Sequence, residues 1–454
     1  MKKYCAFFAL LLSAVFSANA QFTEINGVSK TVKPNNVRLF KVVMGRIEEI
    51  ANTTPNANGS FTLKFQPEYK GYYAIGFGDK YEILDKYKIY AKGNDKINLE
   101  LNDSTYVLNG ENTKENQVLY QWYKLAYKVE CRSVYFNRGK RNMQGFFPEL
   151  QNLVSTSRNW MTGKETGNAE FDQLMKSTID HDLAYFTMAF IISPRASKPN
   201  PNDYTEYVKS FNAEQYLQTE ELLKFPYGTT LLRSLVAFKT QDYYNSAWEK
   251  QLPGISSDVL KGEFVLSKMA AVKSYTNYQE LNDAYNKYFL TIDQKERVKK
   301  IEAGLQKFKP GTAAVNFTCW DASGKEVSLS DFKGKIVLVD VWATWCGPCN
   351  KEIPYLKKLE EEFQGKDVVF LGVSVDEVKD KEKWKSFLIN NQLEGVQVFA
   401  GGWHQSTIAK SYNINGIPRF MLFDRNGNII NVDAPRPSDP KLKEVLNEWL
   451  SKPL

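Results

Sequence analysis

The fold of the C-terminal part of the chain is decided by the stretch Val337-Leu338-Val339-Asp340-Val341-Trp342-Ala343-Thr344-Trp345-Cys346-Gly347-Pro348-Cys349. Its apolar first half has the length of a buried strand, and the residues after Cys349 have the periodicity of a helix. Both sulfurs therefore fall on the first turn of that helix, three residues apart. Unpaired N–H groups and the positive end of the helix dipole favour a thiolate at Cys346. We predict that Cys346 is a redox nucleophile and that Cys349, which we expect to be more buried, resolves its mixed disulfides.

Around this stretch, apolar runs of strand length alternate with amphipathic helices, which is typical of a mostly parallel sheet. The pattern predicts strands over residues 336–342, 368–375, 396–399, 420–423 and 429–432, and helices over 351–363, 381–389, 406–412 and 441–450. The turn formers Asp424-Arg425-Asn426-Gly427 predict a hairpin between the last two strands. Residues 309–454 are thus predicted to form an α/β domain.

The quoted stretch resembles the active-site segment of thioredoxins. Pro354 lies where that family kinks its active-site helix, and Gly416-Ile417-Pro418 resembles the loop whose cis-proline faces the cysteines. The segment 327–335, Val-Ser-Leu-Ser-Asp-Phe-Lys-Gly-Lys, and Glu352 resemble the exported TlpA/ResA-like branch of the family. The resemblance covers residues 309–454 and implies a thioredoxin-like fold with thiol:disulfide oxidoreductase activity.

The resemblance also implies roles for single residues. Asp340 would lie beneath the cysteines and accept or relay the proton of Cys349, a task that Glu352 would share. Both carboxylates would disfavour a nearby thiolate and oppose the helix dipole. Partner peptides would add a strand beside Ile417. The residues expected to contact the substrate are Trp345, Gly347, Pro348, Ile417, Pro418 and Arg419.

Two positions depart from the thioredoxin pattern. Gly372 stands where many thioredoxins carry a lysine that pairs with the buried aspartate, and Arg419 follows the cis-proline where threonine is usual. A cation at residue 419 would lower the pKa of Cys346 or select acidic partners, and both hypotheses stay open here.

The first twenty residues predict a secretory signal peptide, because Lys2 and Lys3 precede an apolar run that ends in small residues. Cleavage before Gln21 would deliver the chain to the periplasm. No later segment is apolar for long enough to span a bilayer. Lysine and arginine alternate with acidic residues rather than forming a stripe, which argues against a nucleic-acid partner.

The rest of the chain predicts two further domains. Short alternating runs broken by turn formers predict a β-sandwich-like module over residues 21–112, and helical periodicity predicts an all-α region over 113–308. The aromatic residues of the helical region are interpreted as core. We expect no cofactor, and we leave the oligomeric state open, with a homodimer through the N-terminal region as one option.

Other readings of the cysteines carry less weight. A zinc site would need a second cysteine pair or more histidines than His181 and His404, and the peroxidase motif is not reproduced around Cys346. We therefore expect no bound metal. Cys131 and Cys319 are interpreted as buried thiols, and a bond between them stays open.

Together these observations predict a periplasmic thiol:disulfide oxidoreductase that works in the reducing or isomerising direction. Its partners would be cysteine-containing envelope proteins and an envelope thiol that donates electrons. The alternative is an envelope protein whose residues 21–308 bind a ligand or partner, with the redox domain as an accessory. The sequence shows no catalytic constellation in residues 21–308.

Overall fold

The computed structural model describes residues 21–31, 36–78, 84–135, 145–192, 199–241 and 248–452. The signal peptide predicted for residues 1–20 lies outside the described residues. The chain divides into two compact units, Met1–Lys261 and Gly262–Leu454, and the division falls within helix α7 (Asp258–Met269). No helix among the described residues has both the length and the apolar character that a membrane span requires.

The first unit begins with two four-stranded sheets, ordered β4-β1-β7-β8 and β3-β2-β5-β6. Their strands are β1 Thr23–Ser29, β2 Val37–Val43, β3 Arg46–Thr53, β4 Ser60–Phe65, β5 Gly71–Gly76, β6 Lys86–Ala91, β7 Lys96–Leu101 and β8 Tyr106–Leu108. Buried side chains of both sheets form one cluster, including Ile25, Leu63 and Ile97 from one and Leu39, Ile75 and Ile89 from the other. This arrangement agrees in outline with the predicted β-sandwich-like module.

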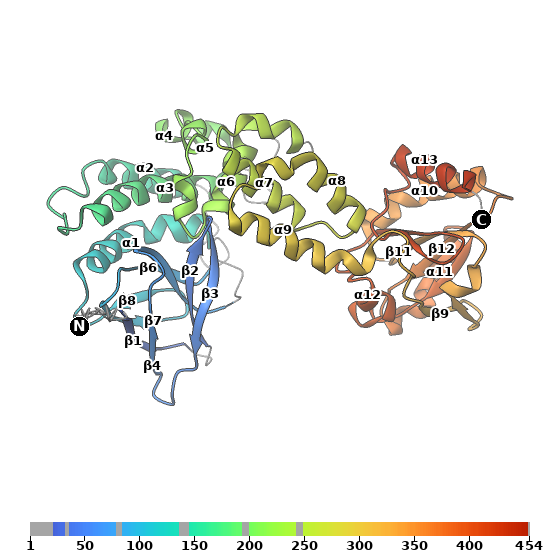
Figure 1. Ribbon diagram of the computed structural model, residues 1–454, viewed down its shortest axis with the longest axis horizontal. Coiled ribbons are helices and arrows are strands. Elements are labelled where there is room, and N and C mark those ends of the chain that lie inside the picture. Colours follow the sequence, from blue (N-terminus) through green and yellow to red (C-terminus); the bar gives the residue numbers. More distant parts are fainter. Residues whose placement is uncertain are drawn as a thin grey trace, which may run out of the picture. The chain divides into compact units, whose positions relative to one another are not determined.

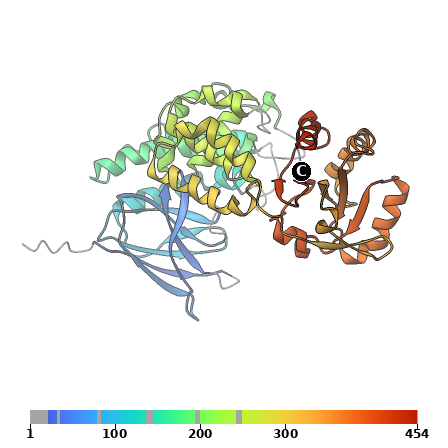
Figure 2. The same ribbon diagram turned by 45° about the vertical axis from the view of Figure 1, so that its right-hand side comes forward.

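Helices follow the sheets within the first unit, as the green part of Figures 1 and 2 shows. They are α1 Lys114–Ser133, α2 Phe146–Ser157, α3 Ala169–Ile192, α4 Glu206–Lys209, α5 Glu214–Leu217 and α6 Gly228–Thr240, with short 3₁₀ segments at Pro201–Asp203, Glu221–Lys224 and Trp248–Gly254. Helix α1 begins at an N-cap, because the Thr113 side chain accepts a hydrogen bond from Asn116 N.

Asp182 of α3 joins the sheet and the helices of the first unit. Its carboxylate is 3% exposed, and it pairs with Lys88 of β6. Trp122 of α1 donates its indole N–H to the same carboxylate at 2.9 Å, and the Tyr227 hydroxyl donates a further hydrogen bond. A buried carboxylate is stable only when it is paired and hydrogen-bonded, and these donors meet that need.

The second unit contains α8 Tyr275–Tyr285 and α9 Ile292–Leu305, followed by a seven-stranded sheet ordered β10-β9-β13-β12-β11-β14-β15. Its strands are β9 Thr318–Asp321, β10 Glu326–Ser328, β11 Ile336–Trp342, β12 Val368–Ser374, β13 Val396–Phe399, β14 Arg419–Phe423 and β15 Ile429–Asn431. Its helices are α10 Gly347–Glu362, α11 Lys381–Asn390, α12 Thr407–Ser411 and α13 Pro440–Ser451. Strands β11, β12 and β13 are parallel, and β14 runs antiparallel to β11.

Helices α10 and α13 pack on one face of this sheet, next to each other in Figure 1. Their buried leucines share one core with alternate residues of β11 and β14. Tyr412, which follows α12, packs against Phe423 of β14, whose side chain points to the opposite face. The sheet with helices on both faces is the α/β arrangement predicted from the sequence, and its predicted strands and helices are all present. Strands β1, β3, β6, β9 and β10 were not predicted.

Candidate active site around the Cys346–Cys349 disulfide

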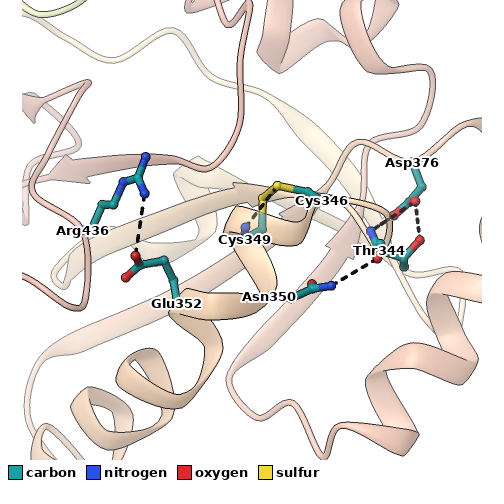
Figure 3. Close-up of a disulfide and its surroundings, with 7 residues drawn as sticks. All are labelled: Thr344, Cys346, Cys349, Asn350, Glu352, Asp376 and Arg436. Carbon is teal, nitrogen blue, oxygen red and sulfur yellow. Dashed lines mark hydrogen bonds and ion pairs between the residues drawn. A yellow bond between two sulfur atoms is a disulfide. The ribbon is translucent and has the colours of Figure 1, made fainter. Parts of the chain in front are cut away.

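Cys346 and Cys349 are joined by a disulfide at the start of α10 (Figure 3). Strand β11 ends at Trp342, so four residues carry the chain from the sheet to the helix. Cys346 is the N-cap of α10, and its sulfur accepts a hydrogen bond from Cys349 N at 3.2 Å. The first helical N–H groups and the helix dipole are thus directed at this sulfur, and they stabilise a thiolate there.

Burial does not distinguish the two cysteines. Each residue is 4% exposed, whereas the sequence led us to expect Cys349 to be the more buried. The difference between the two sulfurs lies in their position relative to the helix N-terminus.

The segment before the cysteines is held by Asp376, a residue that the sequence analysis did not single out. Asp376 is fully buried and follows the carboxyl end of β12. It accepts hydrogen bonds from Thr344 N at 3.0 Å and from the Thr344 hydroxyl at 2.7 Å (Figure 3), and Ser374 donates a third. Parallel strands β11 and β12 end at the same sheet edge, which is the signal that could have pointed to Asp376.

Asp340 of β11 lies on the inner side of the active-site helix. Asp340 and Cys349 line the same small cavity, so the structure brings together the two residues that the thioredoxin resemblance connects. Burial raises the pKa of Asp340 to about 8, and the charges of Glu352 and Glu360 act in the same direction. The carboxyl group is therefore mostly protonated at neutral pH in the oxidised protein.

Glu352 is buried as well, but its carboxylate is engaged elsewhere. It accepts hydrogen bonds from Ser438 N and from the Ser438 hydroxyl, both at 3.0 Å. Arg436 lies 3.8 Å from the same carboxylate, and Figure 3 shows the two side chains directed at each other. These contacts tie α10 to the loop before α13.

The loop that precedes β14 lies at the same sheet edge as the cysteines, because Arg419 pairs with Val341 near the end of β11. The Ile417–Pro418 peptide bond in this loop is cis. Arg419 is 1% exposed, and its side chain is directed at the Val432 carbonyl and at Asp433, 3.3 Å away. The Arg419 guanidinium therefore pairs with Asp433, and its effect on Cys346 and its selection of acidic partners stay predictions.

Two tryptophans form an aromatic rim beside the disulfide. Trp345 is 53% exposed, and its ring meets that of Trp403 edge to face at 5.9 Å. Gly401, Gly402 and Trp403 all have left-handed backbone conformations, with φ of 67°, 73° and 38°. Trp403 N and Gly402 N donate to the carbonyls of Val375 and Asp376, which fixes this strained turn. The sequence analysis did not identify Trp403.

The other cysteines and possible metal ligands were also located. Cys319 is a free thiol, 2% exposed, and burial raises its pKa to about 12. At neutral pH the Cys319 thiol is therefore protonated and a poor nucleophile. Within the described ranges, no three His, Cys, Asp or Glu side chains are grouped to hold a metal ion.

Comparison with known proteins places similarity in the C-terminal part. The family model described as Redoxin matches residues 309–446. Thiol-disulfide oxidoreductase ResA of Bacillus thuringiensis subsp. konkukian is 34% identical over 148 residues, covering 32% of this chain and 80% of that protein. ResA of Bacillus anthracis is 31% identical over 150 residues, covering 33% and 82%. The crystal structure of the thioredoxin domain of a Bacteroides vulgatus thiol-disulfide oxidoreductase is 33% identical, covers 32% of this chain and 99% of that chain, and has a TM-score of 0.29.

Proposed function

Because the chain belongs to the ResA-like thiol-disulfide oxidoreductases, we propose that its Cys346–Cys349 pair exchanges disulfides with cysteine-containing proteins of the bacterial periplasm. The observation that carries this proposal is the disulfide at the N-terminus of α10, with Asp340 in the same cavity as Cys349. The signal-like residues 1–20 support the periplasmic location.

The exchange begins when the Cys346 thiolate attacks a client disulfide. One client sulfur leaves as a thiolate and takes a proton from water, and a mixed disulfide remains on Cys346. The ionised fraction of Asp340, which is the minority at neutral pH because its pKa is about 8, takes the proton of Cys349, and the resulting Cys349 thiolate attacks the Cys346 sulfur. The second client sulfur leaves as a thiolate and takes a proton from water, so the client has gained two electrons and two protons while the Cys346–Cys349 disulfide has formed.

A thiol electron donor of the envelope closes the cycle. When the donor opens the disulfide, the protonated Asp340 can return its proton to Cys349, because its pKa of about 8 keeps it protonated at neutral pH. The Gly347-Pro348 dipeptide between the cysteines supports the reducing or isomerising direction. Thioredoxin, which works in that direction, has a potential of about −270 mV, against about −120 mV for the oxidant DsbA.

Client binding is proposed to use the surface around the disulfide. The backbone of Ile417, beside cis-Pro418, would pair with an extended client segment. The half-exposed Trp345 indole, supported by Trp403, would cover the apolar side chains of that segment. Glu352 would act by positioning α10, given its hydrogen bonds to Ser438.

The first unit offers less support for a separate ligand-binding function. One cavity formed by described residues of this unit, between β6, α1 and α3, has a volume of about 50 Å³. Sites for small molecules usually measure about 300 to 1,000 Å³. The Asp182 carboxylate in this cavity is already bonded to Lys88, Trp122 and Tyr227.

Trapping of mixed disulfides tests the proposed function. The Cys349→Ser variant should retain client proteins on Cys346 when it is expressed in the periplasm, and reduction should release them. Cys346→Ser is the matched control and should retain none. Equal recovery of clients by both variants would contradict the assignment of Cys346 as the nucleophile.

A further inference from the structure

Three residues on neighbouring strands lie side by side beneath the active-site helix. In the sheet register Asp340 of β11 pairs with Gly372 of β12, and Gly372 pairs with Gln397 of β13. Paired residues point to the same face of a sheet. Gly372 has no side chain, and the Gln397 carboxamide fills the space above it: a Cβ on Gly372 would lie 2.2 Å from Gln397 Oε1. Gln397 therefore reaches across β12 toward the strand that carries Asp340.

The orientation of the Gln397 amide follows from its other contact. Gln397 Nε2 donates to the Glu394 carbonyl at 2.8 Å, so Oε1 is the end that lies over Gly372. Gln397 Oε1 and Asp340 Oδ1 are both buried and have no hydrogen-bond partner among the described residues. Both residues line a cavity of about 10 Å³. That volume accommodates about one water molecule, whose two O–H groups match two acceptor oxygens.

Glu360 lines the same cavity. Cys349, Ile353, Leu356 and Glu360 follow one another at helical spacing and line the cavity from α10. Glu360 is partly exposed, and its Oε1 lies against the backbone of Gly395, 2.9 Å from the position of a Cβ there. The cavity therefore extends from the cysteine to a carboxylate that can exchange protons with solvent.

Burial brings two of the three carboxyl groups that line the cavity, those of Asp340 and Glu360, to similar pKa values. Burial raises the pKa of Glu360 to about 7, with the charge of Glu394 acting in the same direction and Lys357 opposing it. Asp340 is surrounded by Glu352 and Glu360 and has a pKa of about 8. A proton can pass between groups of similar pKa at little cost in free energy.

We propose that Glu360 and Gln397 form a proton path that connects Asp340, and through it Cys349, with solvent. This inference rests on the proposed function. When Cys349 attacks the mixed disulfide, its proton passes to Asp340, then through a water molecule held by Gln397 Oε1 to the Glu360 carboxylate, and from there to solvent. When a donor reduces the Cys346–Cys349 disulfide, the proton travels inward by the same route to the Cys349 sulfur. Glu360 and Gln397 act through Asp340 and are positioning and relay groups rather than catalytic residues.

The path is tested by single-turnover exchange between the reduced full-length protein and insulin, followed from pH 5.5 to 9. Glu360→Gln keeps the shape of the side chain and removes its proton exchange. It should slow closure of the Cys346–Cys349 disulfide by about tenfold at neutral pH, a small part of the ~10²- to 10⁴-fold that positioned acid–base groups supply. In the plot of closure rate against pH, the inflection assigned to Asp340 should also move to lower pH, because one negative charge near Asp340 is lost. Glu360→Asp should restore most of the rate.

Two further variants make the result specific. Glu361→Gln, on the exposed side of the same helix, is the matched control and should behave like the wild type. Gly372→Ala places a methyl group where Gln397 Oε1 lies and should also slow closure of the Cys346–Cys349 disulfide. The rate at which Cys346 reacts with a thiol reagent should stay unchanged in this variant. Wild-type rates and inflections in both Glu360→Gln and Gly372→Ala would overturn the proton path. Failure of the wild type itself to exchange with insulin would instead count against the proposed function.

Discussion

The carboxylate of Asp376 accepts hydrogen bonds from both the backbone N–H and the hydroxyl group of Thr344, although 32 residues separate them in sequence. Thr344 lies two residues before Cys346, so this double contact fixes the loop from which the disulfide projects. The backbone carbonyls of Asp376 and Val375 accept hydrogen bonds from Gly402 N and Trp403 N, respectively. These bonds place Trp403 against Trp345. The Asp376 carboxylate thus positions the loop that carries the sulfurs, and the backbone carbonyls of Val375 and Asp376 position the aromatic rim.

Replacement of this carboxylate should therefore affect stability and activity together. Asp376→Ala leaves the N–H and hydroxyl of Thr344 and the hydroxyl of Ser374 without their acceptor, at about 1–3 kcal/mol for each buried group. We expect a lower melting temperature of the redox domain and slower insulin reduction. Differential scanning calorimetry and a turbidity assay measure these effects. Glu377→Ala, at the exposed neighbouring position, should change neither.

The buried carboxyl group of Asp340 should make stability depend on pH. Its folded pKa of about 8 exceeds the ordinary value of 3.8, so the folded chain binds this proton more tightly than the unfolded chain does. Its contribution is fully present below about pH 4 and is lost as the pH rises through 8, at roughly 1.4 kcal/mol for each pKa unit crossed. Asp340→Asn should therefore match the wild type at pH 4 and exceed its stability at pH 9.

Urea unfolding of the oxidised proteins at both pH values checks this expectation. Asp367→Asn, an exposed aspartate next to β12, serves as the control and should follow the wild type at both. A wild-type protein that is as stable at pH 9 as the Asp340→Asn variant would show that Asp340 is ionised without cost.

Trp403 should matter for large clients and not for small disulfides. Trp403→Ala removes the edge-to-face partner of Trp345, a contact worth about 0.5–1.5 kcal/mol. We expect a several-fold higher KM for insulin with a nearly unchanged kcat, and unchanged rates with glutathione disulfide, which is too small to span the rim. Trp320→Ala, at an exposed tryptophan of β9, is the control. An equal loss with both substrates would mean that Trp403 only supports the fold.

Local sequence pattern predicted the redox domain well because its signals are local. Strand β13 and the hairpin of β14 and β15 follow from apolar runs and turn formers. The pattern predicted this helix from residue 351, and α10 begins four residues earlier at Gly347, because Cys346 is its N-cap and Pro348 suits the first helical turn. The thioredoxin resemblance added Asp340 and the loop around Pro418.

Residues that depend on sheet register could not be predicted in this way. Gln397 meets Asp340 only because Gly372 separates them in the register of three strands. Strand β6 was not predicted because it carries one buried and one half-buried lysine, whereas lysine side chains usually lie on the surface. Lys88 is tolerated there by its pair with Asp182, a residue 94 positions away, and Lys86 lies over the ring of Phe40. The pair between Arg419 and Asp433 also joins side chains from two different segments, and the sequence pattern did not predict it.

The bonds that converge on Asp182 have a consequence for how the first unit can be taken apart. Lys88 comes from the sheet, Trp122 from α1, and Tyr227 from the segment before α6. If the chain were divided near residue 112, Lys88 would be in one fragment and Asp182 in the other. Each fragment would carry an uncompensated interior charge. The two parts of this unit are therefore one cooperative block, and expression boundaries belong outside it.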